Sequence, residues 1–251
     1  MASAAIPVQQ GSVTSVQKVA STGFGAAHCL VTQGGQPQVY RYDSPYVFKT
    51  PAAYSISNYG QIVQGAGMLY LLTQEASTFY VVAIDAHTGA EVARTSGISG
   101  KRYGGAVFDP LNEVVYVGTT PTDPSDYGTQ CELLALDART LQQVWSFSSD
   151  LVKGIDAAPA LDGTQLCFGT RNPSTLMLTT NARQAATDVW SWVPDINVIC
   201  ADCTYNYRAA TPLIANGRVY VVFWFLVVYP NQSIVQINAY SLDPAAGAGT
   251  D

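Results

Sequence analysis

The 251-residue sequence predicts an all-β fold, a β-propeller built from four-stranded antiparallel blades. Three observations support this prediction. The composition is typical of strands joined by tight turns, a sequence pattern recurs about every 50 residues, and each recurrence contains four short strand patterns. About five repeats are present, and they form either a closed ring or an incomplete one.

The composition favours strands over helices. Charged residues make up 12% of the chain, about half the usual ~25%, so few charge pairs are available to support long surface helices. The 15 tyrosines favour strands, and the 21 glycines and 13 prolines favour the turns between them. Hydrophobic residues make up 48% of the chain, which is enough for a large core.

An aspartate-containing turn marks the repeat. It occurs at 83–89 (AIDAHTG), 135–141 (ALDARTL) and 241–247 (SLDPAAG), with weaker copies at 40–45 (YRYDSP) and 178–183 (LTTNAR). Asp137 lies 52 residues after Asp85, and Asp243 follows 106 residues later, close to two further periods. A carboxylate at this point accepts a backbone N–H two residues on, and the next residues turn the chain into an outer strand.

A second element keeps step with this turn. It is a Gly, Asn or Asp turn followed by a short apolar strand, at 67–70, 112–118, 163–169 and 217–221. Another short strand precedes each, at 61–64, 104–108, 157–161 and 209–214. Each unit therefore contains an inner strand, an apolar strand, a strand ending at the aspartate turn and an outer strand. This is the strand content of a propeller blade.

No helical period or linker interrupts the repeats, so we predict one domain. Residues 1–11 form an N-terminal tail and residues 12–251 form the propeller. The approximate repeats are 12–50, 51–100, 101–153, 154–203 and 204–251. The last repeat stops before its outer strand. Either a strand at 13–19 completes it and closes a five-bladed ring, or the sequence is an excerpt of a longer propeller.

The longest apolar run, residues 219–229, is too short to span a bilayer as a helix. We therefore predict no transmembrane segment in this sequence. Its central part, 221–227, is predicted to be a blade-core strand covered on both faces. The alternative is an exposed hydrophobic docking surface. No signal peptide is visible at the N-terminus, and the compartment stays open.

The pattern Ala-x-Asp-x-x-Thr-Gly-x-x-x-Trp resembles the repeat of the pyrroloquinoline-quinone-type, or quinoprotein-like, β-propellers. Residues 83–93 carry it with Ala93 in place of Trp, and residues 135–145 carry it with Leu141 in place of Gly and with Trp145 retained. Residues 241–247 carry a shortened form. The resemblance covers about four-fifths of the chain. It implies the propeller fold but no single function, because the repeat occurs in dehydrogenases, outer-membrane assembly lipoproteins and other propellers.

A resemblance to the enzymes of this family implies a bound pyrroloquinoline quinone, a calcium ion that bridges it, an Asp that acts as general base and a Trp stacked on the quinone. It often implies a disulfide between adjacent cysteines as well. No two cysteines are adjacent in this sequence, and most acidic residues belong to turns. No cluster offers the six or more oxygen ligands that calcium requires. We therefore predict a non-enzymatic binding or scaffold module without a cofactor. The alternative is the propeller portion of a quinone-dependent oxidoreductase.

The candidate binding residues come from aligning the inner strands. Tyr103, Asp156 and Arg208 fall at equivalent points, 53 and 52 residues apart, with Tyr59 one blade earlier and Lys153 and Asn206 beside them. Because these residues begin innermost strands, we predict that they ring the mouth of the central channel and bind a protein or a small molecule. The alternative is that they hydrogen-bond across the channel and hold the blades in register.

Two further features bear on partners and redox state. Cys200 and Cys203 form a C-x-x-C motif, which is compatible with a disulfide, with two free thiols or with a metal site that has two more ligands. The net charge of −6 and the pI near 4.7 argue against nucleic acid as a partner, because no basic patch can form.

Overall fold

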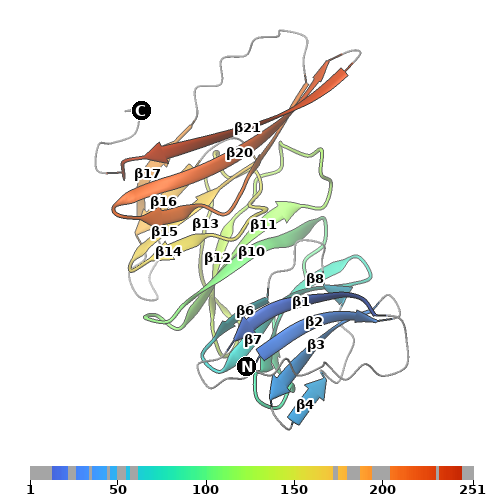
Figure 1. Cartoon of the computed structure of the whole chain (residues 1–251). Coiled ribbons are helices and arrows are strands. Elements are labelled where there is room, and N and C mark those ends of the chain that lie inside the picture. Colours follow the sequence, from blue (N-terminus) through green and yellow to red (C-terminus); the bar gives the residue numbers. More distant parts are fainter. Residues whose placement is uncertain are drawn as a thin grey trace.

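The structure is a computed structural model. It describes residues 13–21, 27–33, 36–43, 46–49, 55–56, 62–171, 175–179, 187–193, 204–229 and 232–244. The regular elements of these residues are β-strands, which form five antiparallel sheets in chain order (Figure 1). No helix in the described part of the chain is long and apolar enough to cross a membrane. Each sheet is a blade, numbered from the N-terminus, and the predicted β-propeller fold is confirmed.

The first two blades occupy the N-terminal third of the chain. The first has the strand order β1 (Val13–Ser21), β2 (Ala27–Gln33), β3 (Gln36–Asp43) and β4 (Tyr46–Lys49). In the second, β5 (Ser55–Ile56) and β6 (Ile62–Gly65) both pair with β7 (Met68–Glu75), followed by β8 (Thr78–Asp85) and β9 (Glu91–Arg94).

The other three blades follow in the same order. The third contains β10 (Lys101–Asp109), β11 (Val114–Pro121), β12 (Leu133–Asp137) and β13 (Gln143–Phe147). The fourth contains β14 (Ala160–Asp162), β15 (Gln165–Gly169), β16 (Thr175–Thr179) and β17 (Thr187–Trp192). In the fifth, β18 (Thr204–Ala209) and β19 (Leu213–Ala215) both pair with β20 (Arg218–Tyr229), which pairs with β21 (Gln232–Leu242).

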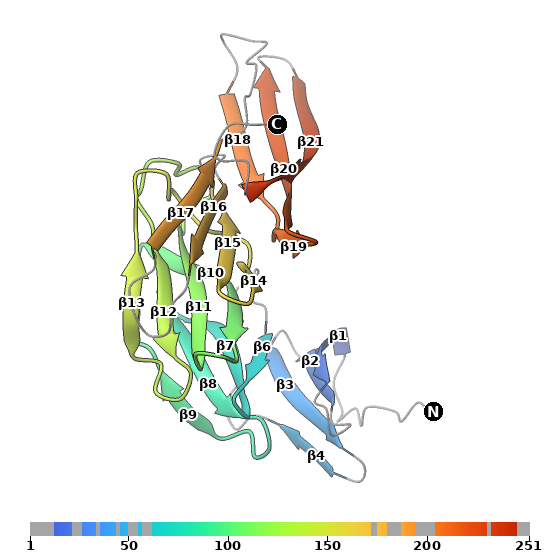
Figure 2. The same ribbon diagram turned by 90° about the vertical axis from the view of Figure 1, so that its left-hand side faces the viewer.

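The blades follow one another along an arc, with the first and fifth at its two ends (Figure 2). The N-terminal strand pairs with its sequence neighbour, Val16 opposite Val31, and so belongs to the first blade. The alternative in which this strand completes the last blade is therefore wrong. Pairing of β1 with β2 needs only a short loop, whereas pairing with the last blade would close a loop of nearly the whole chain. The shorter loop has the lower entropic cost.

The core lies between the blades, because alternate residues of each middle strand face opposite neighbours. On β11, Val115 and Val117 pack with the second blade, whereas Val114 and Tyr116 pack with the fourth. A third apolar cluster joins the fourth and fifth blades. Strands buried on both faces need few charged residues, which explains the low charge content.

The aspartate turns at Asp85 and Asp137 behave as predicted. One Asp85 carboxylate oxygen accepts the backbone N–H groups of His87, at 2.9 Å, and Thr88, at 2.6 Å. Asp137 makes the equivalent bonds with Arg139 and Thr140. Trp145 packs against the Tyr116 ring, with centroids 5.5 Å apart, in the cluster between the third and fourth blades.

The prediction that residues 221–227 are covered on both faces is wrong at Val222, within the part of this run whose side chains the structure describes. Val221 and Phe223 are buried against the fourth blade, but Tyr220 and Val222, which alternate with them, are each 37% exposed. No sheet of the described residues covers that second face, because the fifth blade ends the arc (Figure 2).

Candidate functional site

The structure describes the side chains of only some predicted binding residues. Tyr59 lies outside the described residues, as do both cysteines of the C-x-x-C motif, Cys200 and Cys203. Asn206 and Arg208 lie on β18, where they pair with Leu226 and Trp224, and their side chains are outside the described part. Tyr103 lies on β10, and Lys153 and Asp156 lie between β13 and β14.

Asp156 is held in an ion-pair network between the third and fourth blades. The guanidinium of Arg171 donates to both of its oxygens, from Nε to Oδ2 at 2.8 Å and from Nη2 to Oδ1 at 3.1 Å. Arg102 Nη2 donates to Oδ1 at 3.3 Å, and the Thr120 hydroxyl donates to the same oxygen at 3.0 Å. A carboxylate held in this way is an anchor between blades.

Arg171 connects this network to the loop that follows β11. Its side chain is 0% exposed, and its Nη1 donates to the carbonyl oxygens of Asp123, at 2.9 Å, and Asp126, at 3.1 Å. Loss of one partner from such a buried pair leaves an uncompensated charge, which is strongly destabilising. The sequence prediction missed Arg171. The available signal was a lone Arg two residues after the apolar run of β15, where a buried charge needs a partner.

Glycines bring the same two blades into backbone contact. A Cβ at Gly104 would overlap the carbonyl oxygen of Ile155, and one at Gly105 would overlap the backbone of Ala158. A Cβ at Gly118 would overlap the Ile155 side chain. The segment before β14 therefore packs directly on β10 and β11. We call this contact between the third and fourth blades, with Trp145 and the Arg171 network, the filled junction.

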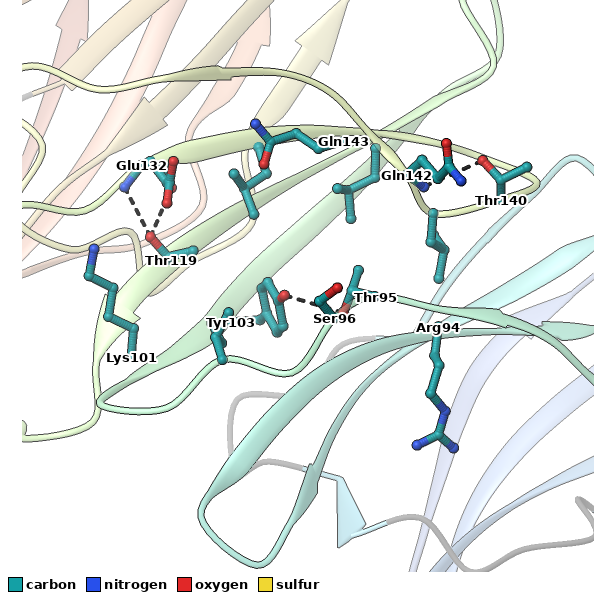
Figure 3. Close-up of a pocket in the computed structure, with 14 residues that line it drawn as sticks. Arg94, Thr95, Ser96, Lys101, Tyr103, Thr119, Glu132, Thr140, Gln142 and Gln143 are labelled. Carbon is teal, nitrogen blue, oxygen red and sulfur yellow. Dashed lines mark hydrogen bonds between the residues drawn. The ribbon is translucent and has the colours of Figure 1, made fainter.

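The junction between the second and third blades is different, because it contains a groove of about 640 Å³ (Figure 3). The segment that links β9 to β10 forms one wall, and β11, β12 and β13 form the other. Leu134, Leu136 and Leu141 give the groove an apolar lining. The polar lining residues are Arg94, Thr95, Ser96, Lys101, Tyr103, Thr119, Glu132, Thr140, Gln142 and Gln143. We call this contact the open junction.

Hydrogen bonds fix parts of the groove wall. The Thr119 hydroxyl donates to the carbonyl oxygen of Glu132 at 3.1 Å and accepts from its N–H at 2.9 Å, which holds the Glu132 backbone in place. Tyr103 donates from its hydroxyl to Thr95 Oγ1 at 3.3 Å, and burial raises the pKa of this phenol, which therefore stays protonated. Lys101 and Glu132 lie at one end of the groove and Gln142 lies at the other (Figure 3).

Arg94 does not direct its charge into the groove. Its guanidinium bonds Glu91 at 2.6 Å and Glu75 at 2.9 Å, and Figure 3 shows it pointing away from the other lining residues. Among the described residues, the charged groups that face the groove are therefore those of Lys101 and Glu132. Tyr103 is the one predicted binding residue with a described side chain that lines this groove.

A single small residue distinguishes the open junction. Strand pairing sets Ala93 opposite Ala83, Trp145 opposite Ala135 and Trp190 opposite Met177, so positions 93, 145 and 190 are equivalent. Trp145 is 7% exposed and Trp190 is 6% exposed, and each fills the junction after its blade. Ala93 packs on the corresponding side of the second blade without an indole ring.

The groove lining shows where that indole would lie. The equivalence of Ala135 and Met177 makes Leu134 and Leu136 the counterparts of Leu176 and Leu178. Leu176 and Leu178 are fully buried in the same cluster as Trp145. Leu134 and Leu136 are also buried in their cluster, at 6% and 2% exposed, but their exposed edges line the groove. The open junction is thus a blade contact that lacks its outer aromatic residue.

The described carboxylates do not fit the calcium ion that the quinoprotein resemblance implies. Calcium takes six to eight oxygen ligands, but the Asp156 oxygens already accept from two guanidinium groups and a hydroxyl. Asp85 and Asp137 accept N–H groups of their own turns. No three His, Cys, Asp or Glu side chains of the described residues are grouped to hold a metal ion.

The blades and their junctions define the chain as a β-propeller, and solved structures share this fold. One is the Dos1 propeller, with a TM-score of 0.55 and 10% identity, covering 88% of this chain and 59% of that one. Another is Sqt1 of Saccharomyces cerevisiae, with a TM-score of 0.51 and 11% identity, covering 92% and 62%. This chain therefore spans about three-fifths of the length of each.

At this identity the likeness shows the fold alone. No protein-family model and no curated protein matches the chain. The resemblance to the quinoprotein repeat is tested by none of these comparisons and stays a prediction.

Proposed function

We propose that the protein is a non-enzymatic binding module, and that the groove of the open junction holds an extended peptide segment of a partner protein. The observation that carries this proposal is the groove itself. Its volume of about 640 Å³ is in the range of ligand sites, and its apolar lining is edged by a few polar groups.

The chemistry of the groove suits an extended peptide. The leucines can receive apolar side chains at their exposed edges. The Ser96 hydroxyl and the Gln142 side-chain amide can bond peptide N–H and C=O groups. Lys101 and Glu132 place one charge of each sign at the same end. Such charges select among peptides and set their direction more than they add affinity.

This proposal differs from binding at the channel mouth in the residues it uses. Asp156 is already bonded to two arginines, so a ligand there would have to displace a buried ion pair. Among the described residues, the side-chain charges of Lys101 and Glu132, which line the groove, are not part of such a buried ion pair. Lys153, which was predicted to lie at the channel mouth, does not line the groove and offers a matched control for Lys101.

The test is a selection from a random library of displayed peptides, about 12 residues long, on the immobilised full chain. The dissociation constant of each selected peptide is then measured by fluorescence anisotropy. We expect Lys101→Glu to weaken binding at least about tenfold, or about 1.4 kcal/mol, and Lys153→Glu to change it less than about twofold.

The proposal fails if no peptide is enriched. It also fails if Lys153→Glu weakens binding more than Lys101→Glu does, because the peptide would then bind at the channel mouth. Circular dichroism of both variants ensures that the loss of binding is not a loss of fold.

A further inference from the structure

The outward face of the fifth blade has the register of a blade contact but no neighbour among the described sheets. Its side chains alternate with those that pack on the fourth blade, as the pleat of β20 requires. The exposed members are Leu213, Tyr220, Val222, Ile237, Ala239 and Ser241. None of these six is charged, and Arg218, two residues before Tyr220 on the same face, bonds Ser241 and pairs with Asp243 at the edge of the face. We call this surface the end face.

Strand register identifies the counterparts of Tyr220 in the other blades. The hairpins that lead into β7, β11, β15 and β20 close at Met68, Val114, Gln165 and Arg218. Two residues further on lie Tyr70, Tyr116, Cys167 and Tyr220. The first three are at most 1% exposed, each in the apolar cluster shared with the following blade. Tyr220 is 37% exposed.

The neighbours of Tyr220 show the same difference. Val222 corresponds to Leu72, which is buried between the second and third blades. Leu72 pairs with the buried Val81, whereas Val222 pairs with the exposed Ala239. Ile237 is 69% exposed. A contiguous apolar face of this kind marks an interaction site on a soluble protein.

We infer that the end face docks a further four-stranded antiparallel β-sheet of the same repeat. The three apolar clusters of this chain show what covers the equivalent face each time. In the third blade the covering residues are branched and apolar, such as Val115 and Val117 of β11, and they lie against Tyr70 and Leu72. The end face offers Tyr220 and Val222 at those positions. Its occupant therefore presents an uncharged sheet face with branched side chains at the β11 positions.

The test supplies such a sheet. A copy of residues 86–153 is fused directly after Asp243, the residue equivalent to Asp85. The copy of β9 then supplies an outer strand for the fifth blade, and the copies of β10 to β13 supply the sheet that should cover the end face. Hydroxyl-radical footprinting with mass spectrometry measures the oxidation rate of Tyr220. We expect the rate in the fusion to fall to that of Tyr70, which is 0% exposed, while Tyr220 of the parent chain reacts readily.

A control fusion carries Val115→Lys and Val117→Lys in the appended copy only, and there Tyr220 should react as in the parent chain. A second fusion appends residues 138–203, with the fourth-blade sheet, in case the first copy does not fold. The inference is overturned if Tyr220 stays reactive in both apolar fusions. It is also overturned if light scattering shows a dimer of the parent chain that protects Tyr220 and that Ile237→Lys dissociates, because a second copy would then be the occupant.

Discussion

The open and filled junctions are built from the same repeat but differ in what occupies them. At the filled junction, Trp145 packs behind the sheet and Arg171 is bonded to Asp156 at the inner side. At the open junction, Ala93 replaces the indole and a groove of about 640 Å³ remains. The backbone register is the same in both, so a few side chains decide whether a blade contact is closed or accessible.

This comparison also separates structural from binding residues. The buried charges of Asp156 and Arg171 at the filled junction bond each other, whereas the charges of Lys101 and Glu132 at the open junction edge a groove over leucines. A repeat of this kind gains a candidate binding site by losing one large side chain. The following predictions test that separation, from the largest effect to the smallest.

The largest effect is expected for Arg171→Ala. The change leaves the Asp156 carboxylate buried with part of its partners removed, and we expect a loss of about 4 kcal/mol in the free energy of unfolding. Urea unfolding at neutral pH measures it. Arg139→Ala, which breaks an exposed pair with Glu113, is the control and should leave stability nearly unchanged. Equal effects of the two changes would mean that the buried network does not hold the filled junction.

Trp145→Ala should make the filled junction resemble the open one. We expect a loss of about 3 kcal/mol, because the change removes a buried indole and leaves a cavity between the blades. The same urea titration measures it. Gln143→Ala changes an exposed residue of the same strand and serves as the control, with an expected change below about 0.5 kcal/mol. A small effect at Trp145 would show that the indole does not close its junction.

Gly105→Ala tests the backbone contact of the filled junction. Its new methyl group would overlap the backbone of Ala158, which cannot move as a flexible side chain can, so we expect a loss of about 2 kcal/mol. Gly128→Ala is the control, because a Cβ there meets only an Asp126 oxygen at 3.8 Å. Differential scanning fluorimetry should show a lower melting temperature for Gly105→Ala alone.

The smallest effect is a pH dependence at the Asp85 turn of the second blade, which has an equivalent at Asp137 in the third blade. The backbone N–H of Thr88, with further bonds from its hydroxyl and from His87, lowers the pKa of Asp85 in the folded protein. The stabilisation is therefore present above the unfolded-state pKa of about 3.9, and it is lost as the pH falls through the lower folded value. Asp85→Ala should reduce the melting temperature slightly at pH 7 and less at about pH 3. A larger effect of Asp85→Ala at low pH would contradict this assignment.

The fold could be predicted from the sequence because its signals are local. Asp85 and Asp137 mark turns through bonds to the next residues, and the spacing of these turns counts the blades. The candidate site could not be predicted from the sequence, because it depends on side-chain contacts between neighbouring blades. The spacing aligned Asp156 with Tyr103, but it did not show that the Asp156 side chain meets Arg171, 15 residues further on, or that Tyr103 lines a groove. The sequence did show Ala93 in place of Trp, the residue change that distinguishes the open junction.

The affinity of a library-selected peptide for Ala93→Trp tests the central claim most directly. The new indole would occupy the equivalent position to Trp145, over the leucines that line the groove. Val92→Trp adds the same ring one residue earlier, at an exposed position, and is the matched control. We predict at least about tenfold weaker binding by Ala93→Trp, with unchanged or higher stability, and less than about twofold change for Val92→Trp. Wild-type affinity in a folded Ala93→Trp variant would contradict the account.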